Sequence, residues 1–148
     1  MIWPFKRKKW EQIGNAWQSS AVEAQLETLL SPDNIFLADR DLRAVPYTEF
    51  EKIIFDCWFP KDIPEYASEI FDCDNFAIAF MAAVQLQWAR ISKGKEALAF
   101  GYIWADVEGM GMHAFIWHMD QLGVIRFYEP QSGKRVEYKL LSTGLVES

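Results

Sequence analysis

The chain has 148 residues, of which 51% are hydrophobic and 24% are charged, and its formal net charge is −6. This balance is typical of a folded protein and excludes intrinsic disorder, and the length indicates one domain over residues 1–148. The negative charge argues against a nucleic-acid partner, because a phosphate backbone repels an acidic surface.

The first ten residues are predicted to form a tail that mixes basic and aromatic side chains. A Lys-Arg-Lys-Lys run at residues 6–9 lies between Phe5 and Trp10. Such a run can contact an anionic membrane or nucleic acid, or it can be a solvated chain terminus. The apolar core of a secretory signal is absent, and no apolar run reaches the roughly 20 residues of a membrane-spanning helix. We therefore expect a cytoplasmic protein without a membrane span.

Three helices are predicted in the first two thirds of the chain. Residues 10–30 carry leucine and valine at helical spacing and end at a Ser-Pro-Asp-Asn stretch. A second helix is predicted to begin at Thr48, where Thr-Glu-Phe-Glu has the pattern of a capping box. The third is predicted to begin after Asp72, its expected cap, and to end near Gly94.

The remaining third of the chain has the alternation of β-strands. Four strands are predicted, at residues 97–105, 112–119, 123–129 and 134–140. Short glycine-rich or polar turns separate them, which indicates an antiparallel meander. Helices followed by such a sheet are typical of the α+β class.

The two cysteines differ in their predicted helical positions and are too few for a disulfide scaffold or a structural zinc site. Cys73 lies in the first turn of the third helix, where the positive end of the helix dipole favours a thiolate. Cys57 lies in the last turn of the second helix, where the dipole opposes one. Asp72 and Asp74 argue against a low pKa for Cys73, because adjacent negative charge disfavours a thiolate. Cys73 is therefore the candidate nucleophile and Cys57 a structural residue.

The two histidines lie five residues apart on one predicted strand, so their side chains point to opposite faces of the sheet. His113 follows a Gly-Met-Gly-Met loop at the beginning of the strand and is the candidate base. His118 lies beside Asp120 near the distal turn, and we expect it at the surface.

Hairpin geometry suggests an acidic partner for His113. If a three-residue turn follows Met119, that residue pairs with Gly123, and His113 lies directly opposite Glu129 with about 5 Å between the Cβ atoms. Glu129 would then orient the imidazole, or the two side chains would form a plain ion pair. A register slip of one residue would place Tyr128 opposite His113 instead.

Three motifs follow one another in the order Cys, His, acid. They are Phe-Asp-Cys-Asp-Asn-Phe-Ala at 71–77, Met-His-Ala-Phe at 112–115 and Phe-Tyr-Glu-Pro-Gln at 127–131. Together they resemble the motif set of a papain-like cysteine protease group that includes the protease domain of the Marasmius oreades agglutinin, and also that of bacterial transglutaminase-like cysteine proteases. The resemblance covers roughly residues 45–135 and implies a papain-like or transglutaminase-like fold. In that fold the Cys73 helix would pack on an antiparallel sheet of about four strands.

The resemblance implies a cysteine hydrolase that cleaves a peptide or amide bond of a peptide or protein substrate through a thioester. Cys73 would be the nucleophile, His113 the base and Glu129 the carboxylate that orients it. The backbone N–H of Cys73 would be one oxyanion donor, and Asn75 and Gln131 are candidates for the second.

Further expectations concern the surroundings of this site. Trp104 and Trp117 either border a substrate groove or pack within the sheet. Calcium is a candidate cofactor by resemblance, since that agglutinin is calcium-dependent and acidic residues flank Cys73, although the sequence does not supply the six to eight oxygen ligands that calcium takes.

Two other functions are compatible with the same residues. One is a cell-wall amidase or acyl-transferase of the same fold. The other is a non-catalytic binding module, interacting with a phage or a host, on a papain-like fold. An inert Cys73 in an intact fold would favour the binding module.

Overall fold

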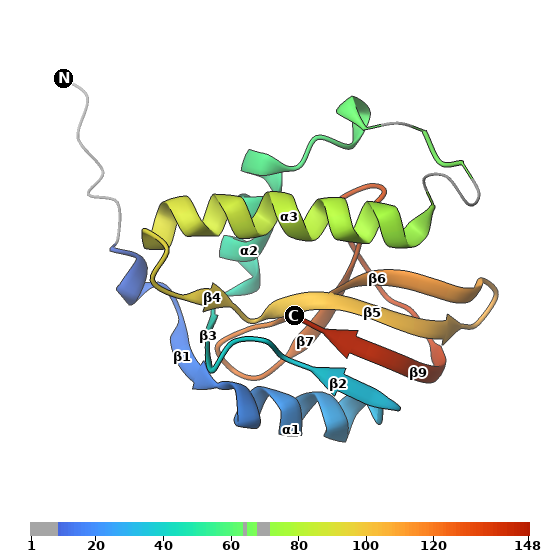
Figure 1. Cartoon of the computed structure of the whole chain (residues 1–148), viewed down its shortest axis with the longest axis horizontal. Coiled ribbons are helices and arrows are strands. Elements are labelled where there is room, and N and C mark those ends of the chain that lie inside the picture. Colours follow the sequence, from blue (N-terminus) through green and yellow to red (C-terminus); the bar gives the residue numbers. More distant parts are fainter. Residues whose placement is uncertain (1–8, 64, 68–71) are drawn as a thin grey trace.

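The structure is a computed structural model that describes residues 9–63, 65–67 and 72–148 (Figure 1). Residues 1–8 of the predicted tail and Phe71 of the first motif lie outside the described residues. The α-helices are α1 (Ser19–Leu30), α2 (Tyr47–Cys57) and α3 (Cys73–Ser92). Short 3-10 helices cover Trp10–Gln12 and Pro60–Asp62.

The strands form two sheets. The larger has the order β2-β9-β5-β6-β7-β8 and the smaller the order β1-β3-β4. The larger sheet contains β2 (Asn34–Phe36), β5 (Phe100–Val107), β6 (Gly111–Met119), β7 (Ile125–Glu129), β8 (Lys134–Val136) and β9 (Leu140–Glu147). The smaller contains β1 (Asn15–Gln18), β3 (Asp41–Ala44) and β4 (Ala97–Leu98). Neighbours pair antiparallel, except for the parallel pairs β2–β9 and β3–β4.

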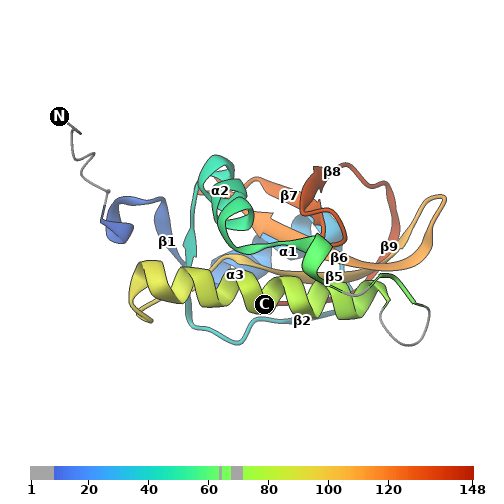
Figure 2. The ribbon, with the colours of Figure 1, turned by 90° about the horizontal axis from the view of Figure 1, so that it is seen from above.

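Helices cover both faces of the larger sheet (Figure 1). Seen from above, α3 runs along β5 and β6 and α2 lies beside it (Figure 2). Alternation along β6 assigns its side chains to the two faces: Ala114 and Ile116 pack with α2 and α3, whereas Phe115 and Trp117 pack with α1. The core therefore has two apolar layers with the sheet between them.

The α+β class, the three helices and the antiparallel meander β5-β6-β7-β8 are confirmed. The helix predicted over 10–30 is too long, because Gly14 has a positive φ of 70° and residues 15–18 pair with β3 before α1 begins. The capping box at Thr48 is wrong. The second helix begins one residue earlier, after Pro46, whose carbonyl accepts the N–H groups of Glu49 and Phe50.

The sequence prediction missed β9 as a separate strand. Its predecessor β8 ends at Val136, and β9 then crosses the sheet to pair with β5. None of the described helices has the length and apolarity needed to cross a membrane.

Candidate functional site

The beginning of α3 is held by a capping box. Cys73 is the first helical residue and Asp72 the N-cap, as expected, and Asn75 Oδ1 accepts the backbone N–H of Asp72 at 3.2 Å. The Asn75 side chain is thus engaged in capping. That bond uses only the carbonyl oxygen of Asn75 and leaves its Nδ2 uninvolved, so the role of Asn75 as a second oxyanion donor stays a prediction.

Cys73 lies against strand β6, where the backbone N–H of Ala114 donates to its sulfur. Burial raises the pKa of the Cys73 thiol above 9.0, and Asp72 and Asp74 raise it further, whereas the N–H groups of Ala114 and Asp74 lower it. The net shift is upward. The thiol is therefore neutral at pH 7: the pKa rise expected from Asp72 and Asp74 is confirmed, and the lowering expected from the helix dipole does not prevail.

Two carboxyl groups flank this thiol. The pKa of Asp74 is raised from 3.8, first by a hydrogen bond with the Asp72 side chain. One Asp72 oxygen is buried and has no hydrogen-bond partner within the described residues. Over the described ranges, three or more His, Cys, Asp or Glu side chains never gather in a group suited to a metal ion. Calcium stays a prediction.

His113 and Glu129 are brought together. The imidazole Nε2 lies 2.7 Å from Glu129 Oε2, and only 6% of His113 is exposed. The predicted register is nevertheless wrong by two residues, because Met119 pairs with Ile125 across a longer turn. A shift of two keeps every side chain on its face, so His113 and Glu129 meet as diagonal neighbours rather than as a directly opposed pair.

Glu129 has two further donors. Tyr138 donates its hydroxyl to Oε2 at 2.6 Å, and the backbone N–H of Gln131 donates to Oε1 at 3.1 Å. Burial alone would raise the pKa of Glu129, but the bonds from His113, Tyr138 and Gln131 hold it below 4.5. Sequence reasoning missed Tyr138, because it lies in the irregular connection between β8 and β9 and no periodicity singles it out.

Cys73 and His113 converge on neighbouring positions of β6, but they are not bonded to each other. In the described part of the chain, no hydrogen bond or ion pair joins them. The thiol faces the Ala114 backbone, and the imidazole is held by Glu129. The docking of α3 against the sheet, which the sequence could not establish, is thus present, whereas a thiolate–imidazolium pair is not.

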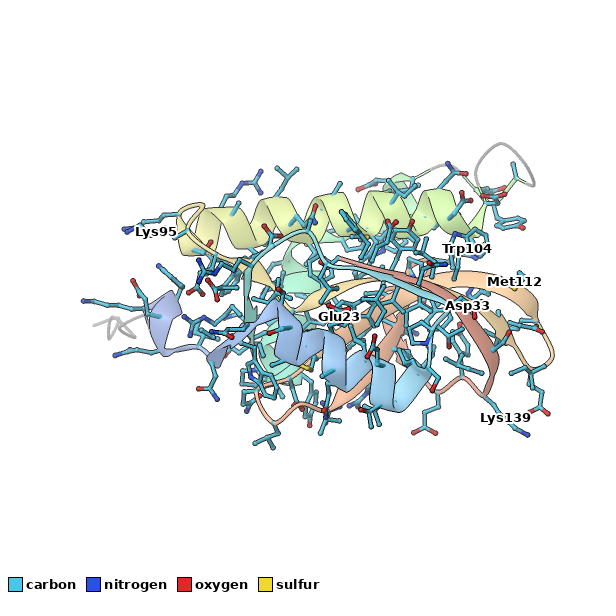
Figure 3. All side chains as sticks on the ribbon, turned by 60° about the horizontal axis from the view of Figure 1, so that its bottom comes forward. Glu23, Asp33, Lys95, Trp104, Met112 and Lys139 are labelled. Atoms are coloured by element: carbon cyan, nitrogen blue, oxygen red, sulfur yellow. The ribbon has the colours of Figure 1, made fainter. Side chains whose placement is uncertain are left out.

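The two tryptophans proposed for a groove have different environments. Trp104 is half-buried, is paired with Ala114 across β5 and β6, and lies at the end of the sheet nearest the start of α3 (Figure 3). Trp117 is fully buried and donates its indole N–H to the Glu147 carbonyl at 2.9 Å. Trp117 is therefore a core residue, and of its two expected environments packing within the sheet is confirmed.

His118 and Cys57 complete the sequence candidates. His118 is fully buried, with its ring stacked on Phe50 at 4.1 Å between centroids. The expectation of a surface position is wrong because helices cover both faces of the sheet, so the face opposite His113 is no more exposed. Burial and Asp56 raise the pKa of the Cys57 thiol to about 11, which agrees with its assignment as a structural residue.

An open groove of about 710 Å³ lies beside the turn that follows Glu129. Its walls carry Phe55 and Phe59, which are 82% and 50% exposed, together with charged side chains of both signs. We call it the aromatic groove and define it by six of its lining residues, Glu51, Phe55, Asp56, Phe59, Lys134 and Arg135. The largely buried Trp58 also lines it and donates its indole N–H to the Pro130 carbonyl at 2.8 Å.

Comparison with known families gives one match. The family described as Agglutinin C-terminal matches residues 45–135, which is 91 of the 148 residues and the same stretch over which the motif resemblance was drawn. A comparison with curated proteins yields no match.

Solved structures with similar folds include two whose titles read "PSL1a-E64 complex" and Polyporus squamosus lectin bound to the human-type influenza-binding epitope Neu5Aca2-6Galb1-4GlcNAc. Each is 26% identical to this chain and covers 87% of it, with TM-scores of 0.71 and 0.69. The chain spans only 51% and 49% of their lengths.

These comparisons contradict the identification as a papain-like cysteine protease. The matching family is an agglutinin family, and one of the two solved structures is named as a lectin. The predictions of a hydrolase, of a thiol protease and of a catalytic triad are therefore wrong. Of the functions compatible with the sequence, the comparisons favour the non-catalytic binding module over the hydrolase and the amidase.

Proposed function

Because the chain belongs to the Agglutinin C-terminal family, we propose that it is a ligand-binding module whose ligand lies where α3 begins against β6. We call this place the α3–β6 site and define it by Cys73, Trp104, His113, Ala114 and Glu129. The observation that carries the proposal is that the Cys73 thiol accepts the backbone N–H of Ala114, the residue that directly follows His113 of the His113–Glu129 pair on β6.

The chemistry of the α3–β6 site suits a ligand with a polar, oxygen-rich group. The site lies at the first turn of α3, where the positive end of the helix dipole favours oxygen acceptors. Trp104 adds an aromatic wall that is only partly covered. The solved PSL1a structure is a complex with E64, and we propose that this chain takes the same compound at Cys73.

E64 is a thiol-reactive epoxide, so its capture by Cys73 would be covalent. The sulfur would form a bond to one epoxide carbon, the carbon–oxygen bond would open, and the thiol proton would end on the released oxygen. Since the pKa of Cys73 is raised, the thiolate fraction at neutral pH is small. We therefore expect the labelling rate to rise about tenfold for each pH unit from 7 to 9, without a plateau.

Intact-mass and peptide-mapping spectrometry after incubation with E64 tests this proposal. We expect one adduct per chain, on Cys73, and none on Cys57, whose thiol has a pKa raised to about 11. Cys73→Ser should abolish the adduct, and Cys57→Ser should leave it unchanged as the matched control. Equal labelling of both thiols, or no adduct at pH 9, would refute the α3–β6 site as the ligand site.

A carbohydrate is the second candidate ligand. One solved neighbour is bound to a sialylated trisaccharide, and the aromatic groove offers exposed Phe55 and Phe59 rings beside carboxylates and basic groups, a combination suited to sugar faces and hydroxyls.

Calorimetric titration with that trisaccharide tests the groove. We expect Phe55→Ala to weaken binding roughly tenfold or more, because truncation removes an aromatic contact surface. Leu122→Ala is the control, since Leu122 is 79% exposed and does not line the groove. Equal affinity in wild type and both variants, or no binding at all, would exclude the groove as a sugar site.

A further inference from the structure

We infer that Tyr138 is the positioning residue of the α3–β6 site, which holds Glu129 in place and through it the imidazole of His113. The inference rests on the proposed function only in assigning this site to ligand binding. The contacts that carry it belong to the protein itself.

Glu129 Oε2 is shared by two donors from different parts of the chain. The Tyr138 hydroxyl approaches it at 2.6 Å, and His113 Nε2 lies 2.7 Å away. The other oxygen, Oε1, accepts the backbone N–H of Gln131 at 3.1 Å. The carboxylate is thus fixed at both oxygens. Of its two side-chain donors in the described residues, only Tyr138 comes from outside the β6–β7 hairpin.

The Tyr138 ring also confines the imidazole. It meets the His113 ring edge to face, with 5.7 Å between centroids and an angle of 82°. The Tyr138 ring also packs edge to face against the Phe115 ring, with 5.0 Å between the centroids and 78° between the ring planes. His113 and Phe115 lie on the same face of β6, so the tyrosine ring borders both of them. Rotation of the imidazole away from Glu129 would require the tyrosine to move.

This arrangement sets the tautomer of His113. Glu129 is ionised at neutral pH, because its three donors more than offset its burial. A carboxylate can only accept, so the hydrogen in the 2.7 Å contact belongs to Nε2. In the neutral imidazole Nδ1 then carries the lone pair, and it has no partner among the described residues. Nδ1 is the atom that His113 can offer to a ligand.

The ring of Tyr138 and its hydroxyl act on His113 and Glu129 in different ways, which a substitution can separate. Tyr138→Phe keeps the edge-to-face contacts and removes only the donor to Oε2. Loss of that donor raises the pKa of Glu129, because the hydrogen bond favours the ionised form. A tyrosine that served only to fill space would leave the carboxylate unchanged in this variant.

The experiment compares wild type, Tyr138→Phe and, as a control, Tyr102→Phe, whose hydroxyl bonds Glu147 instead. Carbon-13 NMR follows the Glu129 carboxyl against pH, and mass spectrometry follows E64 labelling of Cys73. In Tyr138→Phe we expect an upward shift of about one pH unit in the Glu129 titration. We also expect E64 labelling of Cys73 to slow about three- to tenfold. In Tyr102→Phe we expect no change in the Glu129 titration.

The two readouts separate the inference from the proposed function. An unshifted Glu129 titration in Tyr138→Phe overturns the positioning role, whether or not E64 binds. A shifted titration with unchanged labelling overturns it as well, since the ligand site then does not depend on Tyr138. If wild type forms no adduct, the proposed function fails, while the titration still decides whether Tyr138 fixes the carboxylate.

Discussion

The free energy of unfolding is expected to fall by about 1.4 kcal/mol for each pH unit between pH 6.5 and 4.5, because folding buries His118 in its neutral form. The side chain is fully buried, and neither ring nitrogen has a hydrogen-bond partner among the residues that the structure describes. Burial lowers the pKa of His118 to about 3, while Asp120 raises it and Arg126 lowers it by smaller amounts. The proton therefore has no favourable place in the folded protein.

The sign of this pH dependence follows from the protonation of His118 in the unfolded and in the folded state. The unfolded chain binds a proton at His118 near pH 6.5, whereas the folded protein does so only near pH 3. The unfolded state thus holds more protons in this window, and stability is lost as the pH falls through it. Asp120 and Glu129 also have lowered pKa values, but their contributions are lost only near and below pH 4. Asp74, whose pKa is raised from 3.8, acts in the opposite direction, because the folded protein protonates it more readily than the unfolded chain does. The part of the slope that belongs to His118 is therefore the part that His118→Leu removes.

Urea denaturation at pH 7.0, 5.5 and 4.5 measures this loss. Wild type should lose roughly 2–3 kcal/mol across the series, and His118→Leu should lose less than about 1 kcal/mol. Ile116→Val, on the same strand and the same buried face, should be less stable by about 1 kcal/mol at every pH with the wild-type slope. A slope that persists in His118→Leu would show that another group carries the proton uptake.

Replacement of Gly101 by alanine is expected to destabilise the protein by about 3 kcal/mol. A Cβ at this position would overlap the Glu147 carbonyl oxygen and lie 2.7 Å from the Ser148 Cα. The end of β9 would have to move away from β5. That movement would break the 2.9 Å bond from the buried Trp117 indole to the Glu147 carbonyl and leave the donor unpaired.

Gly144→Ala provides a matched control in the paired strand. Within the described part of the chain, a Cβ there meets only the Trp104 carbonyl oxygen, at an ordinary 3.5 Å, and Gly144 does not have a positive φ. We expect no loss of stability, or a gain of up to about 1 kcal/mol from the reduced freedom of the unfolded chain. Thermal denaturation of both variants decides the matter: equal melting temperatures would contradict the close approach of β5 and β9.

Local patterns in the sequence were sufficient for most of the fold. The apolar spacing around Phe50 and Phe80 predicted α2 and α3, and Asp72 was correctly expected as the cap of α3. The alternation after Gly94 predicted the meander. Pairings between distant segments carry no local signal, so the parallel contact of β2 with β9 and the crossing of β9 to β5 were not foreseen.

The contact between His113 and Glu129 was predictable from the sequence, because it depends only on which face of the sheet each side chain occupies. His113 and Glu129 meet although the register was wrong by two residues, because an even shift preserves the face. The pKa rise that Asp72 and Asp74 cause at Cys73 was expected, but the larger rise from its burial was not predictable from the sequence. Likewise, the burial of His118 depends on α2, whose place over the sheet no residue pattern specifies.

The most direct test of the binding-module assignment is a comparison of occupancy with turnover at the α3–β6 site. Wild type and Cys73→Ala are incubated with a defined pool of peptides, and mass spectrometry records every cleaved bond, while E64 adducts are counted in parallel. We predict one E64 per wild-type chain on Cys73 and no peptide cleavage above that of Cys73→Ala. Peptide cleavage by wild type that Cys73→Ala and E64 both abolish would contradict the account, because Cys73 would then act as a catalytic nucleophile.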